Sequence, residues 1–315
     1  MRDKSQILER EARWSVPAGA LTFLAIVLLI VGAVVSAAVS GEDKAEILRS
    51  AHEHSSSLIA GSLLQALGFI LLAVPLVVLF KAAQARSERV RPQLIGLIAV
   101  APLFFGIATG LNGFATTDAA DQFVAGEAKP GISVKAATAD CQDELVDKGG
   151  EKFNDEHGGG NPSVTVRRCA EEKAADEEAE NAVSEASLTG PATGFGLAGK
   201  LGLAIALLYV GLWGMRTGLL TRFWGSLGMA LGVAALLGLV IFLVVWFAYV
   251  ALLLAGIMPG GKPSAWAAGE AIPWPTPGEK AAAELEPEDD GSEDAPDGDG
   301  DGEPPGERRK RKQRD

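Results

Sequence analysis

Long blocks of apolar residues constrain this chain more than any other feature of its sequence. Three blocks, at 16–39, 58–80 and 92–114, contain no charged residue, and a fourth at 195–215 contains only Lys200. A bilayer core of about 30 Å needs about 20 helical residues, and lipid offers no partner for free backbone N–H and C=O groups. Each block is therefore predicted to be a membrane-spanning helix.

Basic residues beside these blocks predict the orientation, because short cytoplasmic loops are enriched in Lys and Arg. The leader before residue 16, the loop at 81–91 and the turn at 216–222 are all basic. We therefore expect them, and the N-terminus, on the cytoplasmic side of a plasma membrane, with the more acidic segment at 40–57 outside. The first apolar block is longer than the core of a cleaved signal peptide, so we interpret it as a retained anchor.

The last apolar block, 223–257, is too long for one straight span. Its 35 residues would make a helix of about 50 Å. Two short spans that meet near Gly238 would return the chain to the cytoplasm, whereas one tilted helix with an interfacial overhang would give five spans in all. The sequence predicts an all-α polytopic membrane helix bundle with six spans, and five spans are the alternative.

The C-terminal half carries several short motifs. Residues 216–229 read Arg-Thr-Gly-Leu-Leu-Thr-Arg-Phe-Trp-Gly-Ser-Leu-Gly-Met, after the segment 177–188 and before Met-Pro-Gly-Gly-Lys-Pro-Ser-Ala-Trp at 258–266 and Ala-Ile-Pro-Trp-Pro at 271–275. This half resembles an uncharacterised family of actinobacterial multi-pass membrane proteins. The resemblance implies a bacterial plasma membrane and two spans in the long block, although the proline-containing turn of the relatives is missing here. It implies no activity and no catalytic residue.

The segment at 115–193 is too long for a simple connection and is predicted to have structure of its own. Ala and Glu dominate 169–187, with Ala and Val at helical spacing, which predicts a helix leading into the fourth span. The glycine-rich stretch at 149–162 predicts an open turn. Cys141 and Cys169 flank that turn and are predicted to form a disulfide outside the cytoplasm, with two free thiols as the alternative.

Four regions follow from this pattern. They are a cytoplasmic leader with three membrane helices at 1–114, an extracytoplasmic acidic loop at 115–193, the last two or three membrane helices at 194–258, and a cytoplasmic tail at 259–315. After residue 277 the tail consists mainly of Pro, Gly, Glu and Asp, which predicts disorder. The net charge of −12 arises in the loop and the tail, so we do not expect a nucleic-acid partner.

Few residues are candidates for chemistry. His52 and His54 offer imidazoles to a metal only if further ligands converge, and surface histidines are the alternative. Gln65 and Asn112 are the strongly polar side chains within the spans, and they are predicted to make polar contacts between helices. No motif for hydrolysis or nucleotide binding appears, so we predict no catalytic residue, no resident metal and no cofactor.

These features leave two functions of different classes. The first is a non-enzymatic membrane scaffold or interaction protein, which lies in the lipid bilayer and binds a protein partner through its extracytoplasmic loop or its cytoplasmic tail. The second is a small-molecule or lipid permease. Coupled transporters usually place ionisable side chains near the middle of the membrane. The spans of this sequence lack such residues, which favours the scaffold.

Overall fold

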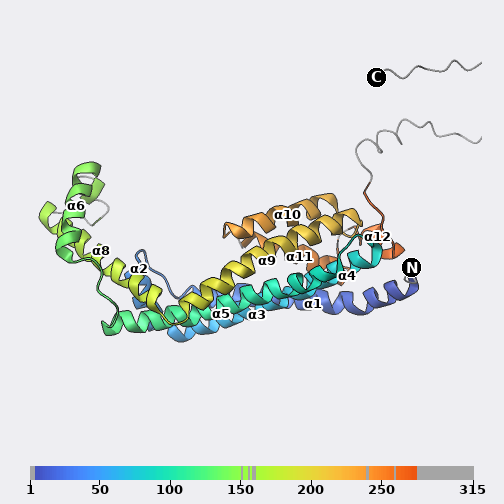
Figure 1. Cartoon of the computed structure of the whole chain (residues 1–315), viewed down its shortest axis with the longest axis horizontal. Coiled ribbons are helices and arrows are strands. Elements are labelled where there is room, and N and C mark those ends of the chain that lie inside the picture. Colours follow the sequence, from blue (N-terminus) through green and yellow to red (C-terminus); the bar gives the residue numbers. More distant parts are fainter. Residues whose placement is uncertain are drawn as a thin grey trace, which may run out of the picture. The chain divides into compact units, whose positions relative to one another are not determined.

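Every regular element that the computed structural model describes is a helix (Figure 1). The description covers residues 4–149, 152–154, 157, 161–238, 241–258 and 260–274, which belong to one unit, Met1–Trp274. The predicted all-α class is confirmed for these residues. The tail after residue 277, for which the sequence predicts disorder, lies outside the described residues, as does most of the predicted glycine-rich turn.

Among the described residues, four helical segments are long and apolar enough to cross a membrane. They are α1 (Lys4–Ser36), α3 (Ser55–Leu71) together with α4 (Ala73–Arg86), the short turn η1 (Pro92–Leu94) together with α5 (Ile95–Ala125), and α9 (Thr189–Arg216). These segments contain three of the four predicted spans and extend past them, whereas α1 starts well before the first predicted span and ends at Ser36, three residues before its predicted end at residue 39. Helix α1 begins at Lys4 and α5 continues to Ala125, because neither glycine nor proline interrupts the polar residues that flank the apolar blocks.

The last apolar block forms two helices, α10 (Arg222–Leu236) and α11 (Ile241–Ala255). They are separated near Gly238, whose φ of 82° lies in the left-handed region that glycine adopts most readily. The structure therefore places a corner where the sequence predicts one. Each helix has 15 residues, or about 22 Å, which is less than the thickness of the hydrocarbon core. The indole Nε1 of Trp246 joins them by donating to the carbonyl of Trp224 at 2.9 Å.

Glycines let the long helices approach one another closely. A Cβ added to Gly199 of α9 would lie 2.6 Å from the backbone nitrogen of Phe105 in α5, and one added to Gly32 of α1 would lie 2.7 Å from the carbonyl oxygen of Gly61 in α3. Real Cβ atoms essentially never come this close to another backbone. Small residues favour such contacts between membrane helices, because packing replaces the hydrophobic effect as the driving force there.

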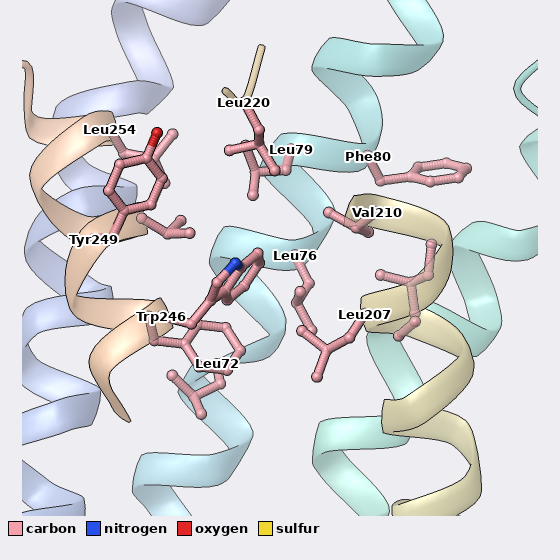
Figure 2. Close-up of a cluster of buried hydrophobic side chains, with 14 of the residues drawn as sticks. Leu72, Leu76, Leu79, Phe80, Leu207, Val210, Leu220, Trp246, Tyr249 and Leu254 are labelled. Atoms are coloured by element: carbon pink, nitrogen blue, oxygen red, sulfur yellow. The ribbon is translucent and has the colours of Figure 1, made fainter. Parts of the chain in front are cut away.

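Large apolar side chains fill the remaining space inside the bundle. Figure 2 shows Trp246 and Tyr249 of α11 facing side chains of the α3–α4 segment, with side chains of α9 on the other side. The side chain of Trp246 is fully buried. The same buried cluster includes Leu72, Leu76, Leu79, Phe80, Leu207, Val210, Phe247 and Leu254.

The polar segments between the apolar blocks form a second group of helices. We call α2 (Lys44–Glu53), α6 (Val134–Lys148), α8 (Pro162–Glu185) and residues 115–125 of α5 the polar module. Ser133 caps α6 by accepting a hydrogen bond from the backbone N–H of Ala136, and Asn161 caps α8 in the same way. The helix predicted at 169–187 thus starts earlier, at Pro162, because the Asn161 cap and the proline favour helix initiation there.

Replacing Gly199 by Ala should destabilise the bundle by roughly 1–3 kcal/mol, because the added methyl group collides with the backbone of α5. Gly194→Ala on the same helix is the matched control. A Cβ there meets nothing within 4 Å, and alanine gains up to about 1 kcal/mol of helix propensity over glycine. Thermal unfolding of both variants in detergent measures the difference. Equal midpoints would show that α5 and α9 do not pack in this way.

Candidate functional site

Cys141 of α6 and Cys169 of α8 lie at disulfide-bonding distance in the polar module. Their Cα atoms are 6.2 Å apart, within the range of about 4.4–6.8 Å that disulfides usually span. Both side chains are fully buried against Phe153 and Val166. The bridge closes a segment whose ends are 28 residues apart in sequence, which stabilises the module by about 3 kcal/mol in a chain-entropy account.

Carboxylates of α8 bind backbone and side-chain groups elsewhere in the polar module. Asp176 accepts a hydrogen bond of 3.0 Å from the backbone N–H of Ala45 in the first turn of α2. Glu180 forms a 2.7 Å ion pair with Lys44, which also belongs to α2. Glu177 accepts a hydrogen bond of 2.7 Å from the backbone N–H of Ile132. The sequence predicts these acids only as solvated charges, because their partners lie far away along the chain.

Glu144 of α6 joins two lysines and so links α6 to α8. Its carboxylate lies 2.8 Å from the Nζ of Lys148 and 2.7 Å from the Nζ of Lys173. Hydrogen bonds from Lys148 and then from Lys173 lower the pKa of Glu144 to about 2. The carboxylate is therefore ionised throughout the physiological range and holds the two helices together.

The faces of the module that pack against each other are rich in alanine. The buried residues here come from α2, α5 and α8 and from the segment after α5, and they are Ala45, Leu48, Ala51, Ala119, Ala120, Ala128, Ala179, Ala182 and Ala186. Short side chains allow the three helices to lie close together. The module therefore has a core of its own, as the prediction of an ordered loop requires.

The structure does not bring His52 and His54 together as metal ligands. The Nδ1 of His52 lies 2.8 Å from the Oδ1 of Asp121 in α5, and the Nδ1 of His54 lies 3.1 Å from the carbonyl oxygen of Ser50. Among the described residues, Glu144, His157 and Cys169 place ligand atoms within 4.8 Å of one another. The sulfur of Cys169 is committed to the disulfide, however, and Glu144 to its lysines. His52 and His54 are both exposed, which fits the alternative interpretation of surface histidines.

One of the two predicted polar contacts between helices occurs. The Nε2 of Gln65 in α3 donates to the Oγ of Ser36 in α1 at 3.3 Å. Asn112 is exposed on α5, and its side chain makes no hydrogen bond to another helix within the described part of the chain. The turn of the helix instead brings Gly110 and Gly113 to the buried face.

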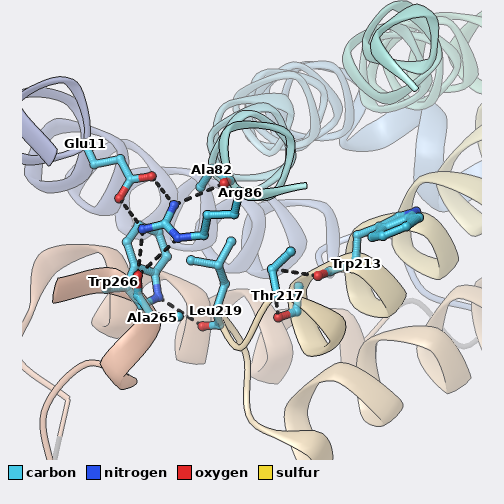
Figure 3. Close-up of polar contacts among 9 residues, drawn as sticks. Glu11, Ala82, Arg86, Trp213, Thr217, Leu219, Ala265 and Trp266 are labelled. Carbon is cyan, nitrogen blue, oxygen red and sulfur yellow. Dashed lines mark hydrogen bonds and ion pairs between the residues drawn. The ribbon is translucent and has the colours of Figure 1, made fainter. Parts of the chain in front are cut away.

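A buried arginine ties three segments together at the other end of the long helices. We call this the basic end. It comprises the first turns of α1, the C-terminus of α4, the connection at 87–91, the turn at 216–222, and α12 (Ser264–Ala268) with the segment that follows it. The side chain of Arg86 is fully buried and forms a two-pronged ion pair with Glu11 (Figure 3), in which Nη2 lies 2.8 Å from Oε2. The same guanidinium donates to the carbonyl oxygens of Ala265, at 2.9 and 3.1 Å, and of Ala82, at 3.1 Å.

Comparisons with protein-family models, curated proteins and solved structures give no match for this chain. The resemblance to an actinobacterial family therefore stays a prediction. The motifs that carry it nevertheless meet in space. Trp266 donates to the carbonyl of Leu219 at 3.0 Å, and Ile272 donates to that of Thr217 at 3.2 Å.

Gly218 explains how the two motif segments come so close. Its φ of 75° is in the left-handed region, and a Cβ there would lie 2.0 Å from the carbonyl oxygen of Ile272. Only glycine fits that turn.

The sequence predicts Arg86 merely as a basic loop residue, because Glu11 lies 75 positions away and no local pattern reveals the pair.

Glu144→Gln should weaken the polar module by about 1 kcal/mol at neutral pH, because the ion pairs with Lys148 and Lys173 are lost. The folded carboxyl has a pKa below its ordinary value of 4.5, so its contribution is complete above about pH 4.5. It disappears as the pH falls towards 2. Thermal unfolding from pH 7 to pH 2 should show the gap between wild type and variant closing across that window.

Asp140→Asn is the matched control for Glu144→Gln, because Asp140 lies exposed on the same helix. Its stability should follow that of the wild type at every pH. A gap for Glu144→Gln that stays constant down to pH 2 would contradict the ion-pair account.

Arg86→Met should destabilise the protein by about 3–5 kcal/mol, because it leaves Glu11 charged and unpaired in a site that is largely closed to water. The double variant Glu11→Met with Arg86→Met should recover part of the loss, since no buried charge then remains. Lys81→Met, at an exposed position of the same helix, is the control. Thermal unfolding in detergent compares the three, and a double variant less stable than Arg86→Met would refute this account.

Proposed function

We propose that this protein is a non-enzymatic membrane scaffold that binds a protein partner through its polar module. The observation that carries the proposal is the internal construction of the module. It has two small cores, a bridge between Cys141 and Cys169, and ion pairs that join α8 to α2 and α6. A mere connection between two spans needs none of these. A surface that is fixed in advance loses less conformational entropy when it binds a partner.

The proposed topology has six spans, with both termini in the cytoplasm of a bacterial plasma membrane. Arginines at the basic end, among them Arg89, Arg216 and Arg222, support a cytoplasmic location for that end. The polar module then lies outside, where cysteines can oxidise. Helices α10 and α11 cross as a short hairpin, which local thinning of the bilayer accommodates.

The interior of the bundle supports a scaffold rather than a permease. By whole-residue burial, the buried polar residues of the bundle in the described part of the chain are the hydroxyl residues Ser15, Thr22, Ser62 and Thr217. The buried guanidinium of Arg86 lies at the basic end and not at the middle of the spans. Thr22 and Ser62 donate to the carbonyls of Ala18 and Leu58 in their own helices. Transporters coupled to ions or protons usually place ionisable side chains at this depth.

A cavity on the polar module is the proposed contact point for the partner. It has a volume of about 640 Å³ and opens between α6 and α8. Val134, Leu145 and Val166 are its apolar lining residues, and Lys135 and Arg167 are cations in the same lining, the latter ion-paired with Glu171. This mixture of apolar and charged groups is typical of a protein-binding surface with a polar rim.

A photo-crosslinking amino acid at Gln142, which lines this cavity, should give a discrete protein adduct in intact cells. The same amino acid at Asp140 should not, because Asp140 is exposed on the same helix but does not line the cavity. Replacing both cysteines by serine should reduce the Gln142 adduct, since the module then loses its bridge. Equal labelling from both positions, together with saturable flux in proteoliposomes, would favour the permease instead.

A further inference from the structure

The basic end contains a second cavity, which the scaffold role does not use. It has a volume of about 750 Å³ and opens between the α4–α5 connection, the α9–α10 turn and the segment after α12. Each of these segments contributes to its wall. Among the lining residues are Arg89, Arg216 and Arg222, and none of the lining residues is an Asp or a Glu.

The walls of this cavity are held by contacts on all sides. Arg216 ends α9, and its Cζ lies 5.6 Å from the ring centroid of Trp213. Arg222 begins α10 and donates to the carbonyl of Trp274 at 3.0 Å. The indole of Trp274 in turn donates to the carbonyl of Leu220 at 2.9 Å. These contacts hold the segments that carry Arg216, Arg222, Trp213 and Trp274 in place around the cavity.

The connection that carries Arg89 is anchored as well. Its neighbour Val90 is buried in the main apolar cluster, and the backbone N–H of Arg91 donates to the hydroxyl of Tyr209 at 2.9 Å. Three guanidinium groups of like charge therefore lie on anchored segments around one cavity. An anion placed between them would be attracted by all three charges.

The position and composition of the cavity indicate which anion it suits. The cavity lies where the apolar parts of α4, α5 and α9 end, which is the level of lipid headgroups, and Trp213 and Trp274 are of the type enriched at that level. Arginine presents a planar fork of donors that matches the oxygens of a phosphate group. Ser226 adds a hydroxyl group to the same wall.

We propose that this cavity binds a phosphate group, with Arg89, Arg216 and Arg222 as its cationic ligands. The group belongs either to the headgroup of an anionic phospholipid or to a free phosphate compound. The indole rings of Trp213 and Trp274 offer the apolar surface against which the glycerol portion of a phospholipid packs. The site is independent of the proposed partner of the polar module, which lies at the other end of the long helices.

Titration of the full-length protein in an uncharged detergent tests this site. The probes are dihexanoyl phosphatidylglycerol, dihexanoyl phosphatidylcholine and inorganic phosphate, and tryptophan fluorescence reports binding. Phosphatidylglycerol should bind saturably and more weakly as the salt concentration rises. Arg89→Gln and Arg216→Gln should each weaken its binding about tenfold, because each loses a charge-assisted hydrogen bond. Arg91→Gln, two positions beyond Arg89 but outside the lining of the cavity, should leave it unchanged.

Each outcome separates the possible ligands. If inorganic phosphate does not compete with phosphatidylglycerol, the ligand is a lipid headgroup. If inorganic phosphate competes effectively with phosphatidylglycerol, the ligand is a free phosphate compound. Both results support the site. Phosphatidylcholine should bind poorly, because its choline cation meets the arginines. The site does not exist if phosphatidylcholine binds as tightly as phosphatidylglycerol, or if Arg89→Gln and Arg216→Gln, folded with unchanged thermal midpoints, bind phosphatidylglycerol like the wild type.

Discussion

Direct contact between helix backbones is the interaction on which the rest of this structure depends. Burying a leucine between helices gains little in lipid, since the lipid chains are as apolar as leucine itself. Close approach gains more, because many atoms then come within van der Waals distance. Helix α5 is central in this respect. A Cβ on its Gly106 would lie 2.6 Å from the carbonyl of Ala66 in α3, and its Phe105 backbone abuts Gly199 of α9. The large side chains around Trp246 fill space that these contacts leave over.

The two ends of the bundle satisfy their polar groups in different ways. In the polar module, lysine, carboxylate and backbone N–H groups pair near the surface, so each pair adds little by itself and the disulfide and the alanine-rich core supply the rest. At the basic end, one guanidinium is withdrawn from water altogether. Its desolvation is offset only because Glu11 and the carbonyls of Ala82 and Ala265 occupy its donors. That geometry also determines where the segment after α11 lies.

The features of the fold that depend on short, continuous stretches of sequence are the ones that could be predicted. The four long apolar helices follow from apolar length alone, and the break near Gly238 follows from the excess length of the last block. The start of α1 and the end of α5 could not be predicted, because hydropathy shows where apolar residues stop and not where a helix stops. Gln65 and Asn112 looked alike in sequence, and only the rotation of each helix against its neighbours separates them. The Arg86–Glu11 pair and the arginines of the second cavity depend on residues brought together by the fold, which no local pattern encodes.

Helix α5 crosses from the bundle into the polar module without a break. Its 31 residues span about 46 Å, and they contact α3 and α9 in one half and α2 and α8 in the other. An unbroken helix is stiff along its length. A tilt of the polar module would therefore reach the glycine contacts with α3 and α9 directly, with no loop between to absorb it.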